Sequence, residues 1–141
     1  MRVAVFTDND FGKVNGVTTA LTAVLKYAPP DIQPRIYTAA DIGVDSDQYL
    51  ALASVGMPIP FYGQMKMYVP RWREYLRRAR GDDVRVLHLT TPGPLGLAAM
   101  LVRRRTGLPM VGSFHTDLSA YTELLSGSPR LGSWMGEYMR W

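Results

Sequence analysis

The sequence predicts an α/β fold, in which a parallel sheet carries helices on both faces. Short apolar segments, such as residues 84–89, alternate with segments whose apolar residues recur at helical spacing, such as residues 17–25. Proline and glycine separate these segments, as at Pro29–Pro30. Strands that alternate with helices are typical of βαβ units, whose crossover helices cover a parallel sheet.

Each segment is assigned from its own pattern. Predicted strands cover residues 3–7, 35–38, 49–55, 84–89 and 109–114; predicted helices cover residues 17–25, 71–80, 95–102, 117–125 and 131–141. We expect residues 41–47 to form a loop, and residues 48–70 to be the least regular part because Pro58, Pro60 and Gly63 interrupt them.

Two helix ends carry clear signals. Pro70 precedes the helix over residues 71–80, and we expect Gly81 to cap its C-terminus. The helix over residues 95–102 is almost wholly apolar, which predicts that it is buried, and Gly107 follows its last basic residues in the usual order.

Length and composition bound the class of protein. A chain of 141 residues with 47% hydrophobic and 20% charged residues is typical of one soluble domain. The absence of cysteine excludes a disulfide framework and a zinc-finger site and is compatible with a cytoplasmic location. We find no apolar run near the ~20 residues of a membrane span and no secretory signal at residues 1–6.

Three loops that follow predicted strands are candidates for a site. They cover residues 7–16, 90–96 and 113–117, and ligands of open parallel sheets bind beyond the carboxyl ends of the strands. Each loop leads into a helix N-terminus, where N–H groups favour anions. Gly16 and Gly93 either permit close approach of a ligand or simply make tight turns, and the pattern alone favours the turn slightly.

The two histidines are predicted to differ in role. His88 lies inside a strand and is expected to be a hydrogen-bonded structural residue. His115 follows a strand end, is flanked by Ser113, Thr116 and Asp117, and is expected to point into the crevice. The chain lacks the Walker A, G-x-G-x-x-G and G-x-S-x-G patterns, which argues against a simple ATPase, a nicotinamide dehydrogenase and a serine hydrolase.

Three segments together resemble a known family. They are Phe6-Thr7-Asp8 with Val14-Asn15-Gly16-Val17, the run from Val86 through His88-Leu89-Thr90-Thr91-Pro92-Gly93 to Gly96, and the run from Gly107 through Gly112-Ser113-Phe114-His115 to Asp117. In this order and spacing they are similar to family 4 glycosyltransferases of the GT-B fold, especially phosphatidylinositol and glycolipid mannosyltransferases and sulfoquinovosyl-diacylglycerol synthases. The likeness covers nearly the whole chain.

The resemblance implies a two-domain, retaining enzyme that transfers a mannose-like hexose from a nucleotide-diphosphate sugar, such as a GDP- or UDP-sugar, to a lipid or glycolipid. Residues 1–141 would form the N-terminal, acceptor-side, Rossmann-like domain, without a cofactor or a metal. The paired-glutamate motif of the donor-binding domain is missing, because Glu74, Glu123 and Glu137 do not have its spacing. We therefore expect a truncated chain, inactive by itself, that would need a separate C-terminal half.

The resemblance also implies residue roles. His115 would be catalytic and contact the transferred sugar, and Asn15 and Gly16 would approach the donor and the acceptor. Asp8, Asn9 and Asp10 would make acceptor or structural contacts. The predicted substrate-binding set is completed by Thr91, Gly93, Thr116 and Asp117.

A basic helix suggests a membrane surface. On residues 71–80, one face carries Trp72, Tyr75, Leu76 and Ala79, and arginines occupy the rest. The residues predicted to face an anionic membrane, at the inner face of the cell membrane, are Arg71, Trp72, Arg73, Arg77 and Arg78. The other interpretation is a helix packed on the sheet with solvated arginines. We expect no nucleic acid partner, and the alternative function is a non-catalytic module that binds a lipid surface or a partner chain.

Overall fold

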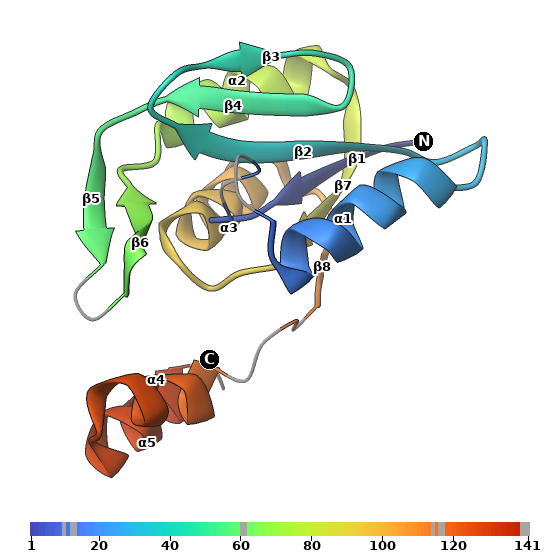
Figure 1. Cartoon of the computed structure of the whole chain (residues 1–141). Coiled ribbons are helices and arrows are strands. Elements are labelled where there is room, and N and C mark those ends of the chain that lie inside the picture. The colour runs from blue at the N-terminus through green and yellow to red at the C-terminus, as the bar shows by residue number, and fades with distance from the viewer. Residues whose placement is uncertain (10, 12–13, 60–61, 114, 116–117, 139–141) are drawn as a thin grey trace.

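The computed structural model describes residues 1–9, 11, 14–59, 62–113, 115 and 118–138. Its main feature is a six-stranded sheet in the order β3-β4-β2-β1-β7-β8 (Figure 1). All neighbouring strands in it are parallel except β3 and β4, which confirms the predicted α/β class. The strands are β1 (Arg2–Phe6), β2 (Gln33–Ala40), β3 (Val44–Asp45), β4 (Tyr49–Ala53), β7 (Val84–Leu89) and β8 (Met110–Gly112).

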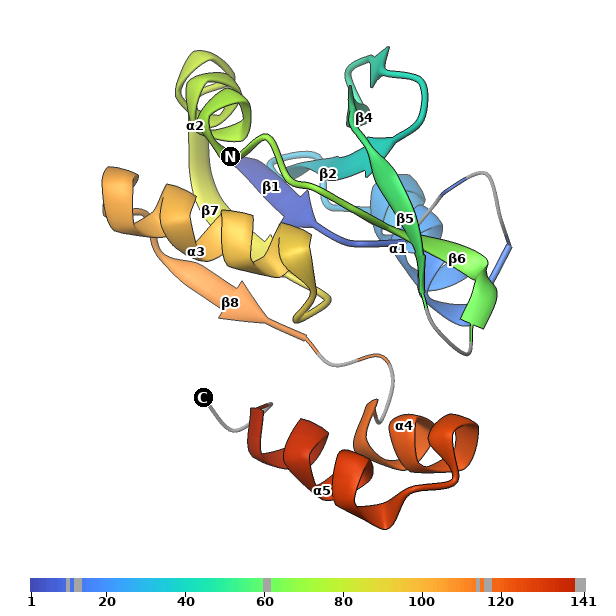
Figure 2. The same cartoon turned by 90° about the vertical axis from the view of Figure 1, so that its left-hand side faces the viewer.

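Helices cover both faces of the sheet, as predicted. Figure 2 shows α2 (Trp72–Gly81) and α3 (Pro94–Thr106) on one side and α1 (Gly16–Tyr27) on the other. Adjacent residues of β1 enter different cores: Phe6 packs with Tyr75 under α2 and α3, whereas Val5 packs with Leu21 of α1. This alternation is what a strand buried on both faces requires.

The ends of α1 and α3 follow from their capping residues. The Asn15 side chain accepts hydrogen bonds from the N–H groups of Val17 and Thr18, and the Thr18 hydroxyl accepts one from the Asn15 N–H, which forms a capping box at the start of α1. Gly107 adopts a left-handed conformation at φ 71° and ends α3, as predicted.

The C-terminus of α2 differs from the prediction. Gly81 is the last helical residue and Asp82 is the cap. The Asp82 N–H donates to the Arg78 carbonyl at 2.8 Å, and the Asp83 N–H donates to the Arg80 carbonyl at 3.3 Å. The left-handed residue that glycine was expected to supply is Asp83, at φ 53°. Aspartate tolerates this region better than most residues, so the chain turns one position later.

The segment from residue 41 to residue 70 is more regular than predicted. The expected loop over residues 41–47 contains β3, and residues 48–70 contain β4 and a two-stranded hairpin of β5 (Gly56–Ile59) and β6 (Tyr62–Tyr68). Pro58 lies inside β5, opposite Lys66. A two-stranded hairpin tolerates proline because each strand has a free edge where no N–H is needed.

Helix α3, which was predicted to be buried, is only partly so, and the edge strand β8 is partly exposed as well. Leu95, Ala98 and Val102 of α3 are buried, whereas Leu97, Met100 and Leu101 are 42–50% exposed, because only one side of the helix packs on the sheet. Strand β8 is shorter than predicted and lies at the sheet edge, where Val111 is 54% exposed.

The last two helices pair with each other. Helices α4 (Leu118–Ser126) and α5 (Pro129–Tyr138) form a hairpin around Gly127, which has φ 64°, and both views show it apart from the sheet (Figures 1 and 2). Gly132 lets the helices approach, since a Cβ there would lie 2.9 Å from the Glu123 Cβ. Among the described residues, no helix has the length and apolar character to cross a membrane.

Candidate functional site

The site is built on three strand ends that lie at the same level. Phe6 of β1 is paired with Leu89 of β7, and Leu89 is paired with Gly112 of β8. The N–H of Thr90 donates to the Phe6 carbonyl at 3.0 Å, and the N–H of Ser113 donates to the Leu89 carbonyl at 2.9 Å. The loops at residues 7–16, 90–96 and 113–117 therefore begin side by side at the carboxyl edge, as predicted.

Asp8 joins the first two loops. Its Oδ2 accepts a hydrogen bond from the Thr91 hydroxyl at 2.6 Å, and its Oδ1 accepts one from the N–H of Leu95 at 2.9 Å. Burial raises the pKa of Asp8, while the hydrogen bonds from Thr91 and from backbone N–H groups act in the opposite direction. The carboxylate thus occupies the N-terminus of α3, where the helix dipole favours a negative charge.

Gly93 is explained by the same carboxylate. A Cβ at this position would lie 2.5 Å from the Asp8 Oδ2, so a side chain would displace the cap. The predicted close approach at Gly93 is therefore made by a residue of the chain itself.

The remaining polar residues of the first loop are also bonded within the chain. Asn9 is buried, and its side-chain Nδ2 donates to the Thr7 hydroxyl at 3.0 Å, while its carbonyl accepts from the Thr38 hydroxyl at 3.2 Å. The Asn15 Nδ2 lies 3.4 Å from the Asn9 Oδ1. Gly16 differs, because it is exposed and nothing lies within 4 Å of where its Cβ would be. Asp10, also predicted to bind substrate, lies outside the described residues.

The third loop is linked to β7 by hydrogen bonds among the side chains of His88, Ser113 and His115. The Ser113 Oγ lies 2.8 Å from the His88 Nε2 and 2.9 Å from the His115 Nε2. His88 is half-buried, and burial, followed by the nearby His115, lowers its pKa. His115 is exposed at the carboxyl edge. The predicted site residues Thr116 and Asp117 lie outside the described residues.

Ser113 is the residue that sequence reasoning left out of the site, although a signal existed. His88 is paired with Val111 in the parallel ladder. Side chains alternate along an extended chain, so residues 111 and 113 share the face of His88. The predicted strands 84–89 and 109–114, once paired, would have brought Ser113 to His88.

Comparison with known proteins gives the family. Glycosyltransferase Family 4 matches residues 14–141, most of the chain. The chain belongs to this family. It is 28% identical over 129 residues to a GDP-mannose-dependent alpha-mannosyltransferase of Mycobacterium tuberculosis. The matched region covers 86% of the chain and 34% of that relative. No solved structure matches the chain.

Two further relatives extend the comparison. The GDP-mannose-dependent alpha-mannosyltransferase of Mycolicibacterium smegmatis is 30% identical, with coverage of 87% of the chain and 34% of the relative. The alpha-monoglucosyldiacylglycerol synthase of Streptococcus pneumoniae is 23% identical, with coverage of 99% and 32%. The chain spans about a third of the length of these family 4 relatives.

Helix α2 of this family 4 chain turns its apolar face to the sheet. Trp72 packs against the larger core, and the guanidinium groups of Arg73 and Arg105 lie 5.6 and 5.5 Å from its ring centre. Arg77 pairs with Glu74 and Arg78 pairs with Asp45, while Arg71 donates to the Ala53 carbonyl at 3.5 Å. Trp72 is therefore turned to the core, and the exposed part of the predicted membrane-facing set consists of arginines.

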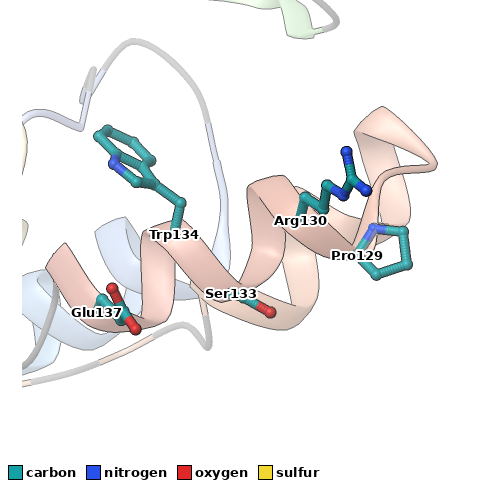
Figure 3. Close-up of a pocket in the computed structure, with 5 residues that line it drawn as sticks. All are labelled: Pro129, Arg130, Ser133, Trp134 and Glu137. Atoms are coloured by element: carbon teal, nitrogen blue, oxygen red, sulfur yellow. The ribbon is translucent and has the colours of Figure 1, made fainter.

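A shallow hollow lies elsewhere, along α5. Figure 3 shows its lining, which comes from this one helix: Pro129, Arg130, Ser133, Trp134 and Glu137. It lies on the helical hairpin and not at the strand ends, and His115 is not among the residues that line it. Among the described residues there is no cluster of three His, Asp or Glu side chains that could hold a metal ion.

Proposed function

We propose that this chain forms the acceptor side of a hexosyl-transfer site in a retaining glycosyltransferase. The donor is a nucleotide-diphosphate sugar that carries a mannose-like hexose, and the acceptor is a lipid or glycolipid. The observation that carries the proposal is the placement of His115, exposed at the aligned ends of β1, β7 and β8 in a chain of family 4. The activities named for two relatives, a GDP-mannose-dependent alpha-mannosyltransferase and an alpha-monoglucosyldiacylglycerol synthase, support the substrate classes.

The chemistry assigned to this side of the site is orientation of the sugar. In glycosyl transfer the anomeric carbon gains positive character while the nucleotide diphosphate leaves with negative charge. A hydrogen bond from the His115 ring to a sugar hydroxyl fixes the anomeric carbon relative to the acceptor oxygen. Gly16, which borders open space, leaves room for the acceptor.

The leaving diphosphate needs partners beyond this side. Asp8 already takes the Leu95 N–H at the start of α3, and Asn15 already takes the Val17 and Thr18 N–H groups at the start of α1. The carboxylate at α3 repels a second anion, and the N–H groups at the start of α1 are already bonded to the neutral Asn15 amide oxygen. The positive groups that hold the diphosphate are therefore assigned to a donor-binding half, as the family resemblance implies, and residues 1–141 alone are expected to be inactive.

A transfer assay tests this proposal. The protein that carries this chain is incubated with labelled GDP-mannose or UDP-glucose and a lipid extract, and the labelled lipid is measured. His115→Ala is expected to lower kcat about a hundredfold or more, because an orienting contact at the reaction centre is lost.

Gln33→Ala is the matched control, because Gln33 is exposed at the opposite edge of the sheet, where β2 begins. This variant should keep full activity. Unchanged turnover in His115→Ala would remove His115 from the site, and absence of any hexose transfer to lipid would contradict the proposal.

The arginines of α2 support a second, weaker proposal: contact with an anionic membrane, either beside catalysis or as a non-catalytic module. Arg73 and Arg77 are exposed on the side of α2 away from the sheet, and Arg77 retains 73% of its side-chain exposure despite its pair with Glu74. Basic residues near an anionic bilayer add to its attraction.

Vesicle sedimentation tests it. Replacing Arg73 and Arg77 by Gln is expected to weaken binding to anionic vesicles at least about fivefold, whereas Arg103→Gln with Arg104→Gln, at the end of α3, serves as the charge-matched control. An equal loss of vesicle binding in both double variants, or vesicle binding that does not depend on salt concentration, would contradict this proposal.

A further inference from the structure

The chain contains two histidines, and one serine hydroxyl lies between them. The Ser113 Oγ is 2.8 Å from the Nε2 of His88 and 2.9 Å from the Nε2 of His115. Both distances are ordinary for a hydrogen bond between nitrogen and oxygen. The two rings therefore meet the same oxygen through the same type of nitrogen.

A single hydroxyl hydrogen restricts what this arrangement permits. A serine hydroxyl donates one hydrogen bond and accepts up to two, and a neutral imidazole carries its proton on one nitrogen only. If the hydroxyl donates to His115, it is free to accept from His88, whose Nε2 then carries the proton. If it donates to His88 instead, the roles reverse. In both arrangements the Ser113 hydroxyl donates to one ring and accepts from the other. One ring therefore carries its proton on Nε2 and the other on Nδ1, so the two rings are opposite tautomers.

The two rings are not equivalent, and this gives the coupling a direction. His88 lies in β7, paired with Val5 on one side and Val111 on the other, and it is half-buried on the face that α1 covers. Burial lowers the pKa of His88 and so favours its neutral ring, which carries a proton on only one of its two nitrogens. His115 follows the last strand and is exposed.

We propose that His88 is a positioning residue that acts through the Ser113 hydroxyl, holding the His115 ring in the tautomer opposite to its own. The Nε2 of His115 is then engaged by Ser113, and its Nδ1 remains for a ligand. With the His88 proton on Nε2, the His115 Nδ1 donates a hydrogen bond; with the His88 proton on Nδ1, it accepts one.

The suggested ligand is a sugar hydroxyl, and only this step rests on the proposed function. A hydroxyl both donates and accepts, so the tautomer of His88 decides which way round the sugar hydroxyl must be oriented. The tautomer coupling itself is a property of the chain and does not depend on catalysis.

Ring-nitrogen NMR of the 141-residue chain tests the coupling directly. Long-range proton–nitrogen correlations show which nitrogen of each ring carries the proton, and with two histidines the spectrum contains two ring systems, which His115→Ala assigns. We expect the majority tautomers of the two rings to be opposite, with opposite pairs favoured over identical pairs about fivefold, the preference that one hydrogen bond of ordinary strength provides.

Variants at Ser113 carry the decisive comparison. Ser113→Ala should release both rings and reduce each tautomer preference about fivefold, whereas Ser113→Thr, which keeps a hydroxyl, should restore it. His88→Leu should change the NMR chemical shifts of the His115 ring nitrogens, because the coupling runs through the Ser113 hydroxyl and not through direct contact of the rings. Thr22→Val, which removes a hydroxyl bonded to the Thr18 carbonyl on α1, is the control and should change neither ring.

Three results would overturn the proposal: identical tautomers in the two rings, unchanged His115 signals in Ser113→Ala, or loss of the preference in Thr22→Val as well. Should His88→Leu fail to fold, the two Ser113 variants decide alone.

The transfer assay separates this inference from the proposed function. Coupled tautomers in a protein that transfers no hexose would refute the function and leave the coupling intact. Hexose transfer that is lowered in Ser113→Ala and recovered in Ser113→Thr would support both.

Discussion

The loop after β1 and the loop after β8 begin at the same level of the sheet, yet they use their polar residues differently. In the first, Asp8 bonds to Thr91 and to the N–H of Leu95, and Asn15 bonds to the first N–H groups of α1. In the second, the Ser113 hydroxyl bonds to two imidazoles, one of which, His115, is exposed.

The difference shows how a structural polar residue is told from a candidate functional one. A side chain that accepts hydrogen bonds from the free N–H groups of a helix stabilises the fold as a cap. An exposed side chain whose hydrogen bond goes to another side chain, as that of His115 goes to Ser113, caps no helix and is a candidate for contact with a ligand. The polar residues of the loop after β1 join secondary structures, whereas the loop after β8 leaves His115 exposed as the candidate functional residue.

The largest expected effect concerns Asp8 and His115, each replaced by alanine. Asp8→Ala should lower the free energy of unfolding by about 3 kcal/mol, because it leaves the Leu95 N–H and the Thr91 hydroxyl without their charged partner. His115→Ala should change it by less than about 0.5 kcal/mol. Urea unfolding measures both, and equal losses would erase the distinction between the loops.

The glycines at two helix starts sharpen the comparison. A Cβ at Gly96 would lie 2.3 Å from the Thr91 carbonyl oxygen, so Gly96→Ala should cost about 2 kcal/mol. Gly16→Ala meets nothing within 4 Å and should be neutral or slightly stabilising. Thermal unfolding compares them; a Gly16→Ala variant as unstable as Gly96→Ala would show that Gly16 serves the fold.

Asn15→Ala should have a smaller effect. It removes the acceptor for the Val17 and Thr18 N–H groups, and the loss of such a cap costs about 1 kcal/mol. Asn15→Asp keeps the acceptor and is the control, expected near the stability of the original chain. If both variants lose equally, the contact of the Asn15 amide with Asn9 matters more than the cap.

The smallest effect is a dependence on pH. Burial raises the pKa of Asp8 above its ordinary value of 3.8, and its hydrogen bonds partly oppose the shift. A raised carboxyl pKa means that ionisation of Asp8 is less favourable in the folded chain than in the unfolded chain. The pH-dependent part of its contribution to stability is therefore fully present below pH 3.8 and is lost as the pH rises through the raised value, whereas its hydrogen bonds remain. Relative to Asp8→Asn, the original chain should therefore lose stability as the pH rises above 3.8. A difference that stays constant or grows with pH would contradict the shift.

The elements most accurately predicted were those whose sequence pattern is set locally. Residues 84–89 are mostly β-branched or otherwise apolar and are bounded by polar residues, and they form β7 with these same ends. The hairpin of β5 and β6 was missed because prolines count against strands, although an edge accommodates them. Exposure was harder to predict, since the apolar residues of α3 do not reveal which of its sides lacks a covering layer.

The common position of the three loops was predicted, but the hydrogen bonds between them were not. The alternation of strands and helices is enough to gather the three loops on one edge. That Asp8 reaches the start of α3, 87 residues later in the sequence, depends on the pairing of β1 with β7, which no local pattern states. The role of Ser113 depends in the same way on the pairing of β7 with β8.

The alignment of Phe6, Leu89 and Gly112 has an evolutionary consequence. Each loop starts from a fixed origin, so residues inserted or deleted beyond that origin change one loop and leave the others where they were. A single residue inserted within β7 would instead turn His88 to the opposite face of the sheet and separate it from Ser113. The loops are thus free to diversify one at a time, while the length of the strands is held constant.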